Sequence, residues 1–268
     1  MQKSTFVKRA FVLLLAVALL AVGGCARAAV DTEVVIFKIG QADAILITSG
    51  GHAVLLDAGE DEDAAEILSH LKQRNISALD AMIITHFDKD HVGGADGVLL
   101  GIPVKALYDA DYEGKGKQYE PYLRAVEAAG VPRTRVSEET TLSFGPLSVT
   151  LLPSGLSTES DNDLSLAVLM TDGHHRFFFA GDAEEARIGE LLEGELSPCD
   201  VLKMPHHGRY KQNLPALLDA LSPRYAVLTD SDKNPAEAKT LSLLEGRGIQ
   251  MRATRDGDVL IVSNEKGI

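Results

Sequence analysis

One short segment, His86-Phe87-Asp88-Lys89-Asp90-His91, constrains most strongly what this chain can form. It directly follows the run from Ala81 to Thr85, which has the apolar character of a strand buried on both faces. Gly93 and Gly94 come next, and glycine lets a backbone curl without Cβ clashes. Imidazole nitrogens and carboxylate oxygens gathered at one point suit Zn²⁺, Mn²⁺ or Fe. The segment therefore predicts a metal-binding loop at the end of a buried strand.

Strand-like and helix-like patterns alternate around this loop. Strands are expected at 34–39, 44–48, 53–57, 81–85, 140–152 (a hairpin), 164–170, 176–180, 201–204, 225–228 and 259–262, and helices at 62–74, 119–129, 213–221 and 235–246. Residues 93–102 are expected to form a loop or short helix, and residues 109–120 a mobile loop near the substrate. Strands in the first and last thirds, each group with helices, predict one α/β domain of two packed sheets with helices outside.

The first 25 residues have the pattern of a signal peptide. A positive start precedes an apolar run at 11–22, which is too short for a bilayer crossing of roughly 20 residues. Val22-Gly23-Gly24-Cys25 resembles a lipobox, which predicts a lipid on Cys25 and attachment to the membrane of the cell envelope. The alternative is ordinary cleavage after Ala26-Arg27-Ala28, which would leave a secreted or periplasmic protein.

The net charge and the cysteine content each exclude one kind of protein. The net charge is −13, and the segment 1–24 holds three positive and no negative charges, so the rest of the chain stands near −16. This balance argues against a broad nucleic-acid-binding surface, although a metal ion can supply local positive charge for a phosphate. Cys25 and Cys199 are the only cysteines, so a disulfide framework is not expected, and Cys199 is predicted to be a buried apolar side chain.

The pattern His86-x-Asp88-x-Asp90-His91 resembles the HxHxDH signature of the metallo-β-lactamase superfamily, with Asp88 in place of the second histidine. This variant is similar to the β-lactamase-like domain of the ComEC competence protein and its free-standing relatives. Further segments resemble motifs of that group in the same order: 37–47 ("DVGQGDAILI"), 55–59 ("LIDTG"), 162–166 ("NDNSL"), 180–184 ("TGDLE"), 201–208 ("VLKVPHHGS") and 254–261 (the closing strand).

The resemblance implies that residues 30–268 form a four-layered αββα hydrolase domain with two divalent metal ions, Zn or Mn. The residues carried over as ligands are His86 and Asp88 for one ion, Asp90 and His91 for the other, Asp182 as a bridge and His206 to complete the second site. His207 is the alternative ligand, or a residue that orients the ligand. A metal-bound hydroxide would be the nucleophile, and Asp90, Asp182 and His207 are the candidate catalytic residues.

The same comparison assigns supporting roles. Asp57 is expected to hydrogen-bond the ligand loop, and Gly40, Gln41 and Asp43 to form a structural turn. His174 and His175 are expected to be exposed turn residues.

A departure from the family pattern concerns the first metal site, and two basic residues near the histidine pair concern the substrate. Asn162 stands where the superfamily usually supplies a third histidine, and together with Asp88 it makes the first metal site rich in oxygen, which favours Mn²⁺. Lys203 and Arg209 flank the histidine pair, either as part of a solvated face or as a rim that contacts phosphate. Asn162, Lys203 and Arg209 are therefore the candidate substrate-binding residues.

These observations predict an exported metal-dependent hydrolase of phosphate esters. The ester is a phosphodiester or phosphomonoester, with DNA or phosphocholine-bearing polymers as examples. One alternative is a lactam or lactone hydrolase of the same fold. A second is a non-catalytic metal-binding protein of the envelope.

Overall fold

The computed structural model describes residues 31–268, which form one compact unit. The predicted leader, its lipobox and Cys25 lie outside the described residues. None of the helices between Asp31 and Ile268 combines the length and the apolar composition that a bilayer crossing requires.

The first sheet has seven strands. In spatial order they are β14 (Val259–Ser263), β1 (Thr32–Ile36), β2 (Ile45–Ser49), β3 (His52–Leu56), β4 (Ala81–Ile84), β5 (Leu107–Ala110) and β6 (Arg133–Val136). Neighbours are antiparallel from β14 to β3 and parallel from β3 to β6. All four residues of β4 are buried, as its apolar sequence predicts for a central strand.

The second sheet repeats this plan. Its order is β13 (Gln250–Ala253), β12 (Tyr225–Leu228), β11 (Val201–Lys203), β10 (Arg176–Phe179), β9 (Ala167–Thr171), β8 (Leu147–Leu152) and β7 (Thr140–Phe144). Neighbours are antiparallel from β7 to β10 and parallel from β10 to β13. Each sheet thus presents the carboxyl ends of its parallel strands, where loops commonly carry functional side chains.

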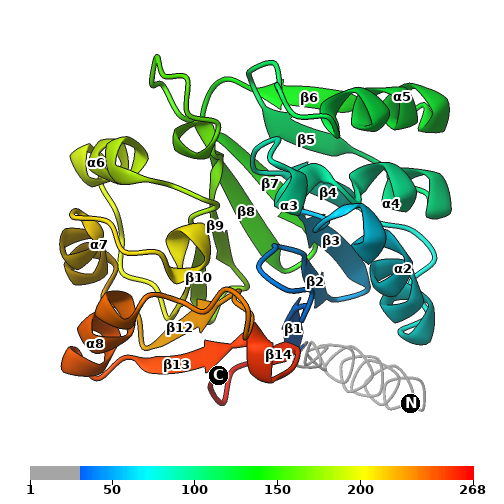
Figure 1. The fold of residues 1–268 in the computed structure, drawn as a ribbon. Coiled ribbons are helices and arrows are strands. Elements are labelled where there is room, and N and C mark those ends of the chain that lie inside the picture. Colours follow the sequence, from blue (N-terminus) through cyan, green and yellow to red (C-terminus); the bar gives the residue numbers. More distant parts are fainter. Residues whose placement is uncertain (1–30) are drawn as a thin grey trace, which may run out of the picture. The chain divides into compact units, whose positions relative to one another are not determined.

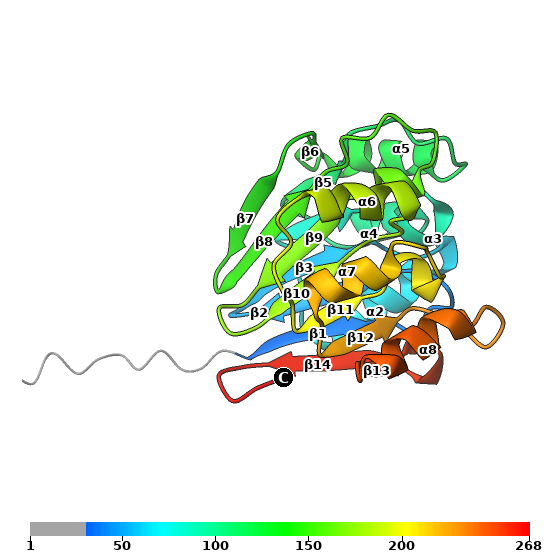
Figure 2. The ribbon, with the colours of Figure 1, turned by 90° about the vertical axis from the view of Figure 1, so that its left-hand side faces the viewer.

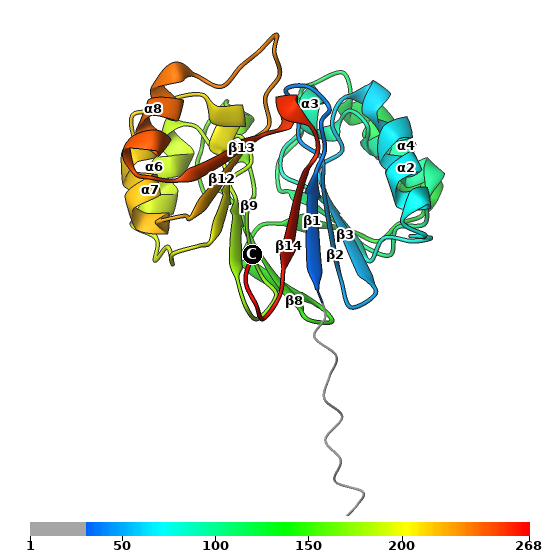
Figure 3. The same ribbon diagram turned by 90° about the horizontal axis from the view of Figure 1, so that it is seen from below.

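Helices cover the outer face of each sheet, as Figures 1 and 3 show. Beside the first sheet lie α2 (Ala64–Gln73), α4 (Ala95–Gly101) and α5 (Tyr119–Ala129), and beside the second lie α6 (Glu185–Glu193), α7 (Leu214–Leu221) and α8 (Ala238–Gly246). Figure 2 shows α6, α7 and α8 in front of the second sheet. Apolar clusters fill all three interfaces between the layers. The expected four-layered αββα sandwich is confirmed.

Several elements were absent from the sequence-based expectations: β5, β6, α6 and β13. The strands β6 (RTRV) and β13 (QMRA) are polar and only partly buried because each forms the edge of a sheet. The expectation that a loop begins at residue 109 is wrong, since β5 continues to Ala110.

Candidate metal centre

The candidate site forms where loops from both sheets meet. After β4 the chain passes through His86 and enters the short helix α3 (Lys89–Val92), which carries Asp90 and His91. Asp182 follows β10 of the second sheet, and the histidine pair follows β11. Residues that lie about 90 positions apart in the sequence are therefore brought into contact.

Asp182 lies between two buried imidazole rings. Its Oδ1 atom is 3.2 Å from His91 Nε2, and its Oδ2 atom is 3.1 Å from His207 Nε2. Asp90 Oδ2 is 3.4 Å from the same His207 nitrogen, and the His86 ring lies 4.1 Å between centroids from that of His91, with the ring planes tilted by 50°. These contacts bring Asp182, which the sequence resemblance makes a bridging ligand, together with His91 and His207.

Several buried donor atoms in this cluster lack a hydrogen-bond partner among residues 31–268. They are Asp43 Oδ1, His86 Nε2, His91 Nε2, Asp182 Oδ1, His206 Nδ1 and His207 Nε2. Buried polar atoms are nearly always paired, so a group of unpaired imidazole nitrogens and carboxylate oxygens is the arrangement expected of a metal-binding site. Imidazole nitrogen and carboxylate oxygen are the donors that Zn²⁺ and Mn²⁺ accept, so these residues fit divalent metal ions.

The other nitrogen of each ring is held by an outer partner. Asp57 accepts hydrogen bonds from His91 Nδ1 at 2.8 Å and from the backbone N–H and hydroxyl of Thr85 at 2.7 Å each. The Thr85 hydroxyl lies 3.1 Å from His86 Nδ1 and can accept its proton. These contacts leave both Nε2 atoms free as donors to a metal. The expected role of Asp57 in holding the ligand loop is confirmed.

The geometry separates the roles of His206 and His207. The His207 side chain is buried and directed at Asp182, whereas the His206 side chain is 16% exposed, with Nε2 3.9 Å from Asp182 Oδ2 and Nδ1 3.1 Å from Glu184 Oε1. Both residues have left-handed backbone, with φ of 45° and 56°, a conformation that non-glycine residues adopt at a cost. The structure therefore places His207, the alternative left open by the sequence, in the ligand cluster, and His206 at its exposed side.

Asp43 and Lys203 do not lie where the sequence suggested. Asp43, assigned above to a structural turn, is buried and groups with His91, Asp182 and His207, each offering a donor atom within 4.8 Å of the others. Lys203 is 1% exposed and forms an ion pair with Asp43. A fully buried ammonium cannot belong to an exposed rim, so its predicted contact with substrate is corrected.

The exposed side of the cluster, which we call the mouth, is formed by Asp88, His206 and Glu184. Asp88 Oδ2 lies 3.8 Å from His86 Nε2, and its side chain is 45% exposed. Lys211 binds Glu184 at 2.6 Å. Asn162 begins a 3₁₀ turn (Asn162–Leu164), and its Oδ1 atom is buried without a partner within residues 31–268. Arg209, the remaining residue that the sequence predicts to contact substrate, is exposed.

Without metal, the charges of the cluster shift its protonation. Burial opposes a charge on His207, but the carboxylates of Asp182, Asp43 and Asp90 raise its pKa to about 10. Burial and the neighbouring His91 lower the pKa of His86 to about 3. Burial, together with Asp161 and Asp90, raises the pKa of Asp88 to about 6. Metal binding must therefore displace protons.

The two glycines after the ligand loop permit close packing. Gly93 and Gly94 have ordinary helical φ values of −54° and −77°, so a tight curl is not what requires them. A Cβ at Gly94 would overlap the carbonyl oxygen of Ala58, and one at Gly93 would lie 2.8 Å from the Glu60 Cα. Glycine lets the loop after β3 pack directly on α3 and α4.

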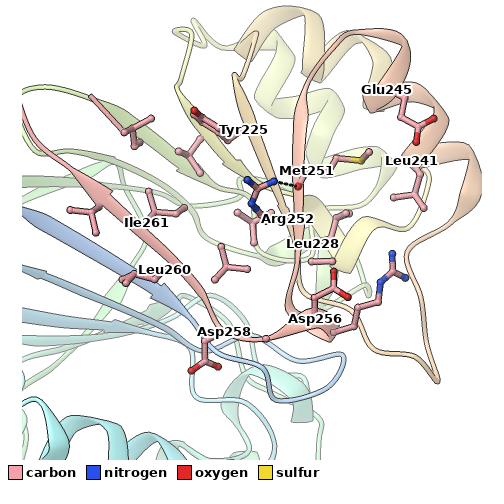
Figure 4. Close-up of a pocket in the computed structure, with 18 residues that line it drawn as sticks. Tyr225, Leu228, Leu241, Glu245, Met251, Arg252, Asp256, Asp258, Leu260 and Ile261 are labelled. Atoms are coloured by element: carbon pink, nitrogen blue, oxygen red, sulfur yellow. Dashed lines mark hydrogen bonds between the residues drawn. The ribbon is translucent and has the colours of Figure 1, made fainter. Parts of the chain in front are cut away.

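Other predicted features lie away from the cluster. Cys199 is buried, as expected. His174 is exposed, but His175 is half-buried, and its Nδ1 lies 2.7 Å from Ser263 Oγ. A cavity of about 850 Å³ opens between β13 and β14 at the edge of the sandwich (Figure 4) and shares no lining residue with the cluster.

The structure combines an αββα sandwich with a centre rich in histidine and aspartate at the strand ends. This combination is typical of one class of metal-dependent hydrolases. The chain belongs to the metallo-β-lactamase superfamily, whose family model matches residues 38–228.

The chain is similar to competence and recombination proteins. It is 29% identical over 212 residues to Recombination protein 2 of Haemophilus influenzae, an alignment that covers 77% of this chain and 25% of the relative. It is 27% identical over 255 residues to ComE operon protein 3 of Bacillus subtilis, covering 85% and 33%. The resemblance to the ComEC group is confirmed, and the chain spans about a quarter to a third of the length of these relatives.

Solved structures share the fold. The metallo-β-lactamase fold protein YhfI from Bacillus subtilis superposes with a TM-score of 0.59 at 14% identity, covering 87% of this chain and all of YhfI. CmlA, a diiron β-hydroxylase from Streptomyces venezuelae, superposes with a TM-score of 0.55 at 16% identity, covering 88% of this chain and 54% of CmlA. At these identities the likeness concerns the fold alone.

Proposed function

We propose that this protein is an exported metal-dependent hydrolase that cleaves phosphate esters. The observation that carries the proposal is the position of Asp182 between His91 and His207, with unpaired buried donor atoms around it. The relatives named for recombination and competence favour a phosphodiester, such as that of DNA, over a phosphomonoester.

Two divalent ions, Zn²⁺ or Mn²⁺, would be held by residues from both sheets. The proposed ligands are His86 and Asp88 for one ion, Asp90, His91 and His207 for the other, and Asp182 for both. When bound, such ions polarise a scissile phosphoryl group and lower the pKa of water.

His206 and Glu184 are placed to move a proton at the mouth. Glu184 Oε1 accepts a hydrogen bond from Lys211 and lies 3.1 Å from His206 Nδ1, while His206 Nε2 lies 3.9 Å from Asp182 Oδ2 at the edge of the cluster. A histidine oriented in this way can deliver a proton to the leaving oxygen of an ester. Asn162 and the exposed Arg209 are the proposed substrate contacts.

Turnover of chromogenic phosphate esters tests this function. Purified protein loaded with Mn²⁺ or Zn²⁺ should hydrolyse bis-p-nitrophenyl phosphate faster than p-nitrophenyl phosphate, and Asp182→Asn should abolish both activities. Absence of turnover with either ion, in protein shown to bind metal, would reject the proposal. Nitrocefin and a lactone serve as parallel substrates, because turnover of these alone would favour a lactam or lactone hydrolase. Inactivity on all four would favour a non-catalytic binding protein.

Export and lipid attachment are a separate part of the proposal. The support is the lipobox-like segment that ends at Cys25. The wild-type protein should enter the membrane fraction with a lipid on Cys25, and Cys25→Ser should move it to the soluble fraction. A soluble wild-type protein that begins after residue 28 would instead support ordinary signal cleavage.

A further inference from the structure

A buried lysine lies behind the candidate metal cluster. Lys203, the last residue of β11, is 1% exposed, and its ammonium contacts the buried carboxylate of Asp43. The same Nζ atom is 3.7 Å from Asp182 Oδ1 and donates to the carbonyl oxygen of Gly181 at 3.3 Å. A buried ammonium is costly unless it is paired, so these oxygen contacts fix its position.

Asp43 lies on the Nδ1 side of the His91 and His207 rings, opposite their unpaired Nε2 atoms. Its Oδ1 is 3.4 Å from His207 Nδ1, and its Oδ2 is 3.9 Å from His91 Nδ1. Both rings direct their other nitrogen, Nε2, at Asp182. Asp43 therefore contacts the histidines from behind, and its Oδ2 is already occupied by the ammonium of Lys203.

His207 Nδ1 can donate its proton to Thr229 Oγ1 at 2.9 Å, and Asp43 Oδ1 lies 3.4 Å from the same nitrogen as a charge contact without a hydrogen bond. An imidazole that binds metal through Nε2 is neutral, so it cannot balance the charge of Asp43. Among the described residues that contact Asp43, Lys203 is then the cation that remains. The ionised Asp43 depends on Lys203 for its charge balance, and its negative charge beside His207 Nδ1 favours the tautomer that carries the proton there and leaves Nε2 for a metal.

We propose that Lys203 is a positioning residue for the metal centre. It holds Asp43 in place as a carboxylate behind His207, so that the Nε2 atom of His207 is presented to the metal. The inference rests on the metal-binding part of the proposed function and is independent of the substrate.

Metal affinity of four variants tests the proposal. Lys203→Met removes the charge and the donor, Lys203→Gln keeps a donor without charge, Asp43→Asn removes the carboxylate charge, and the double variant Lys203→Met/Asp43→Asn removes both charges. Outer partners of ligating histidines typically affect metal affinity by about 10- to 100-fold. Mn²⁺ affinity should therefore fall at least about tenfold in Lys203→Met and Asp43→Asn, and less in Lys203→Gln. The Mn²⁺ affinity of the double variant should be no lower than that of the single variant with the lower affinity, because both residues act through one chain of contacts.

The Co²⁺-loaded protein gives a second readout. Lys203→Met should change the visible absorption spectrum of bound Co²⁺, which reports the geometry of the ligands. Arg133→Met is the matched control. Arg133 forms an ion pair of 2.6 Å with the buried Asp109, and neither residue belongs to the cluster. It should lower the Tm without changing the Mn²⁺ affinity or the Co²⁺ spectrum.

Three results would overturn the proposal. One is a folded Lys203→Met variant with Mn²⁺ affinity within about twofold of wild type, well short of the expected range. Another is a double variant whose loss of affinity equals the product of the two single losses. If Lys203→Met does not fold, the double variant decides: failure to fold there as well means that Lys203 serves packing rather than the charge of Asp43. All of these readouts are obtained without substrate, so they are independent of whether phosphate esters are cleaved.

Discussion

The two adjacent histidines of the centre, His206 and His207, have different surroundings and can therefore have different roles. His207 is buried against Asp182, whereas His206 is directed to the mouth and paired with Glu184. The left-handed backbone at both positions turns the two rings to an interplanar angle of 71°. One residue can thus bind metal while the next acts on the substrate.

Alanine substitutions at the two histidines should have separable effects. His207→Ala should lower the number of metal ions bound per chain and abolish turnover, since it removes a ligand. His206→Ala should retain the wild-type metal content and lose about 100-fold or more in kcat, the usual scale for a missing proton donor. Elemental analysis and kinetics on the same samples make the measurement. Loss of metal in His206→Ala with full content in His207→Ala would reverse the assignment.

Asp57 gives a second prediction at this scale. Asp57→Asn keeps the size of the side chain but removes the charge that holds His91 Nδ1 and the Thr85 hydroxyl. Metal affinity should fall by about 10- to 100-fold, as is usual for an outer carboxylate partner of a ligating histidine. Competition with a chromogenic chelator measures it. An unchanged affinity would show that Thr85 alone orients the ring.

Sequence reasoning identified most residues of the cluster but not their arrangement. The spacing of His86, Asp90 and His91 after a buried strand was sufficient to predict a metal loop. Two adjacent histidines carry no local signal of which side chain is directed inward, because that depends on the left-handed turn at 206–207. The position of Asp43 is set by packing between loops distant in sequence, which a local turn pattern does not reveal.

Packing between elements places the ligand loop. The backbone of Gly94 lies against the loop that follows β3, with Gly94 N donating to Gly59 O at 3.1 Å. This contact joins the loop that follows β3 to the helices α3 and α4.

Gly94→Ala should therefore destabilise the protein by about 1–3 kcal/mol, the usual effect of overpacking. The cause is the overlap of the new Cβ with the carbonyl oxygen of Ala58. Gly246→Ala in α8 is the control, because no atom lies within 4 Å of a Cβ there, and its stability should stay within about 1 kcal/mol of wild type. Denaturant unfolding compares the two. Equal stability of both variants would mean that the loop after β3 yields to the methyl group.

The elements that were predicted well are those with a strong apolar period. Helix α5 and strand β12 have the predicted bounds, and β4 differs by one residue. The short strands β5, β6 and β13 have mixed or polar sequences and are defined by hydrogen bonds to a neighbouring strand. Pairing of this kind is a property of the assembled sheet, so the local sequence does not reveal it.

At the scale of the whole molecule, the centre joins the two sheets through buried charges. Without metal, protonated His207 lies between the carboxylates of Asp182 and Asp90 and stabilises the folded state. Its folded pKa of about 10 lies above the ordinary value of 6.5, so this stabilisation is complete below pH 6.5 and is lost as the pH rises toward 10.

The Tm of the metal-free protein should therefore fall between pH 7 and pH 10. The metal-loaded protein should show a flatter profile, because the ion replaces the proton. Calorimetry with and without a chelator provides the comparison, and Lys105→Met serves as a surface control that should follow the wild-type profiles. A metal-free Tm that is constant over this range would contradict the assigned charge state of His207.

The contact between Asp182 and His91 across the two sheets has a kinetic consequence. An ion held by both His91 and Asp182 is a cross-link that closes a loop of roughly 90 residues, and cross-links across long loops restrict the unfolded chain most. The sheets could separate only after ligands leave the ion, so dissociation of the metal would become part of the barrier to unfolding. The ions that serve the chemistry would then also set how long the protein survives proteases.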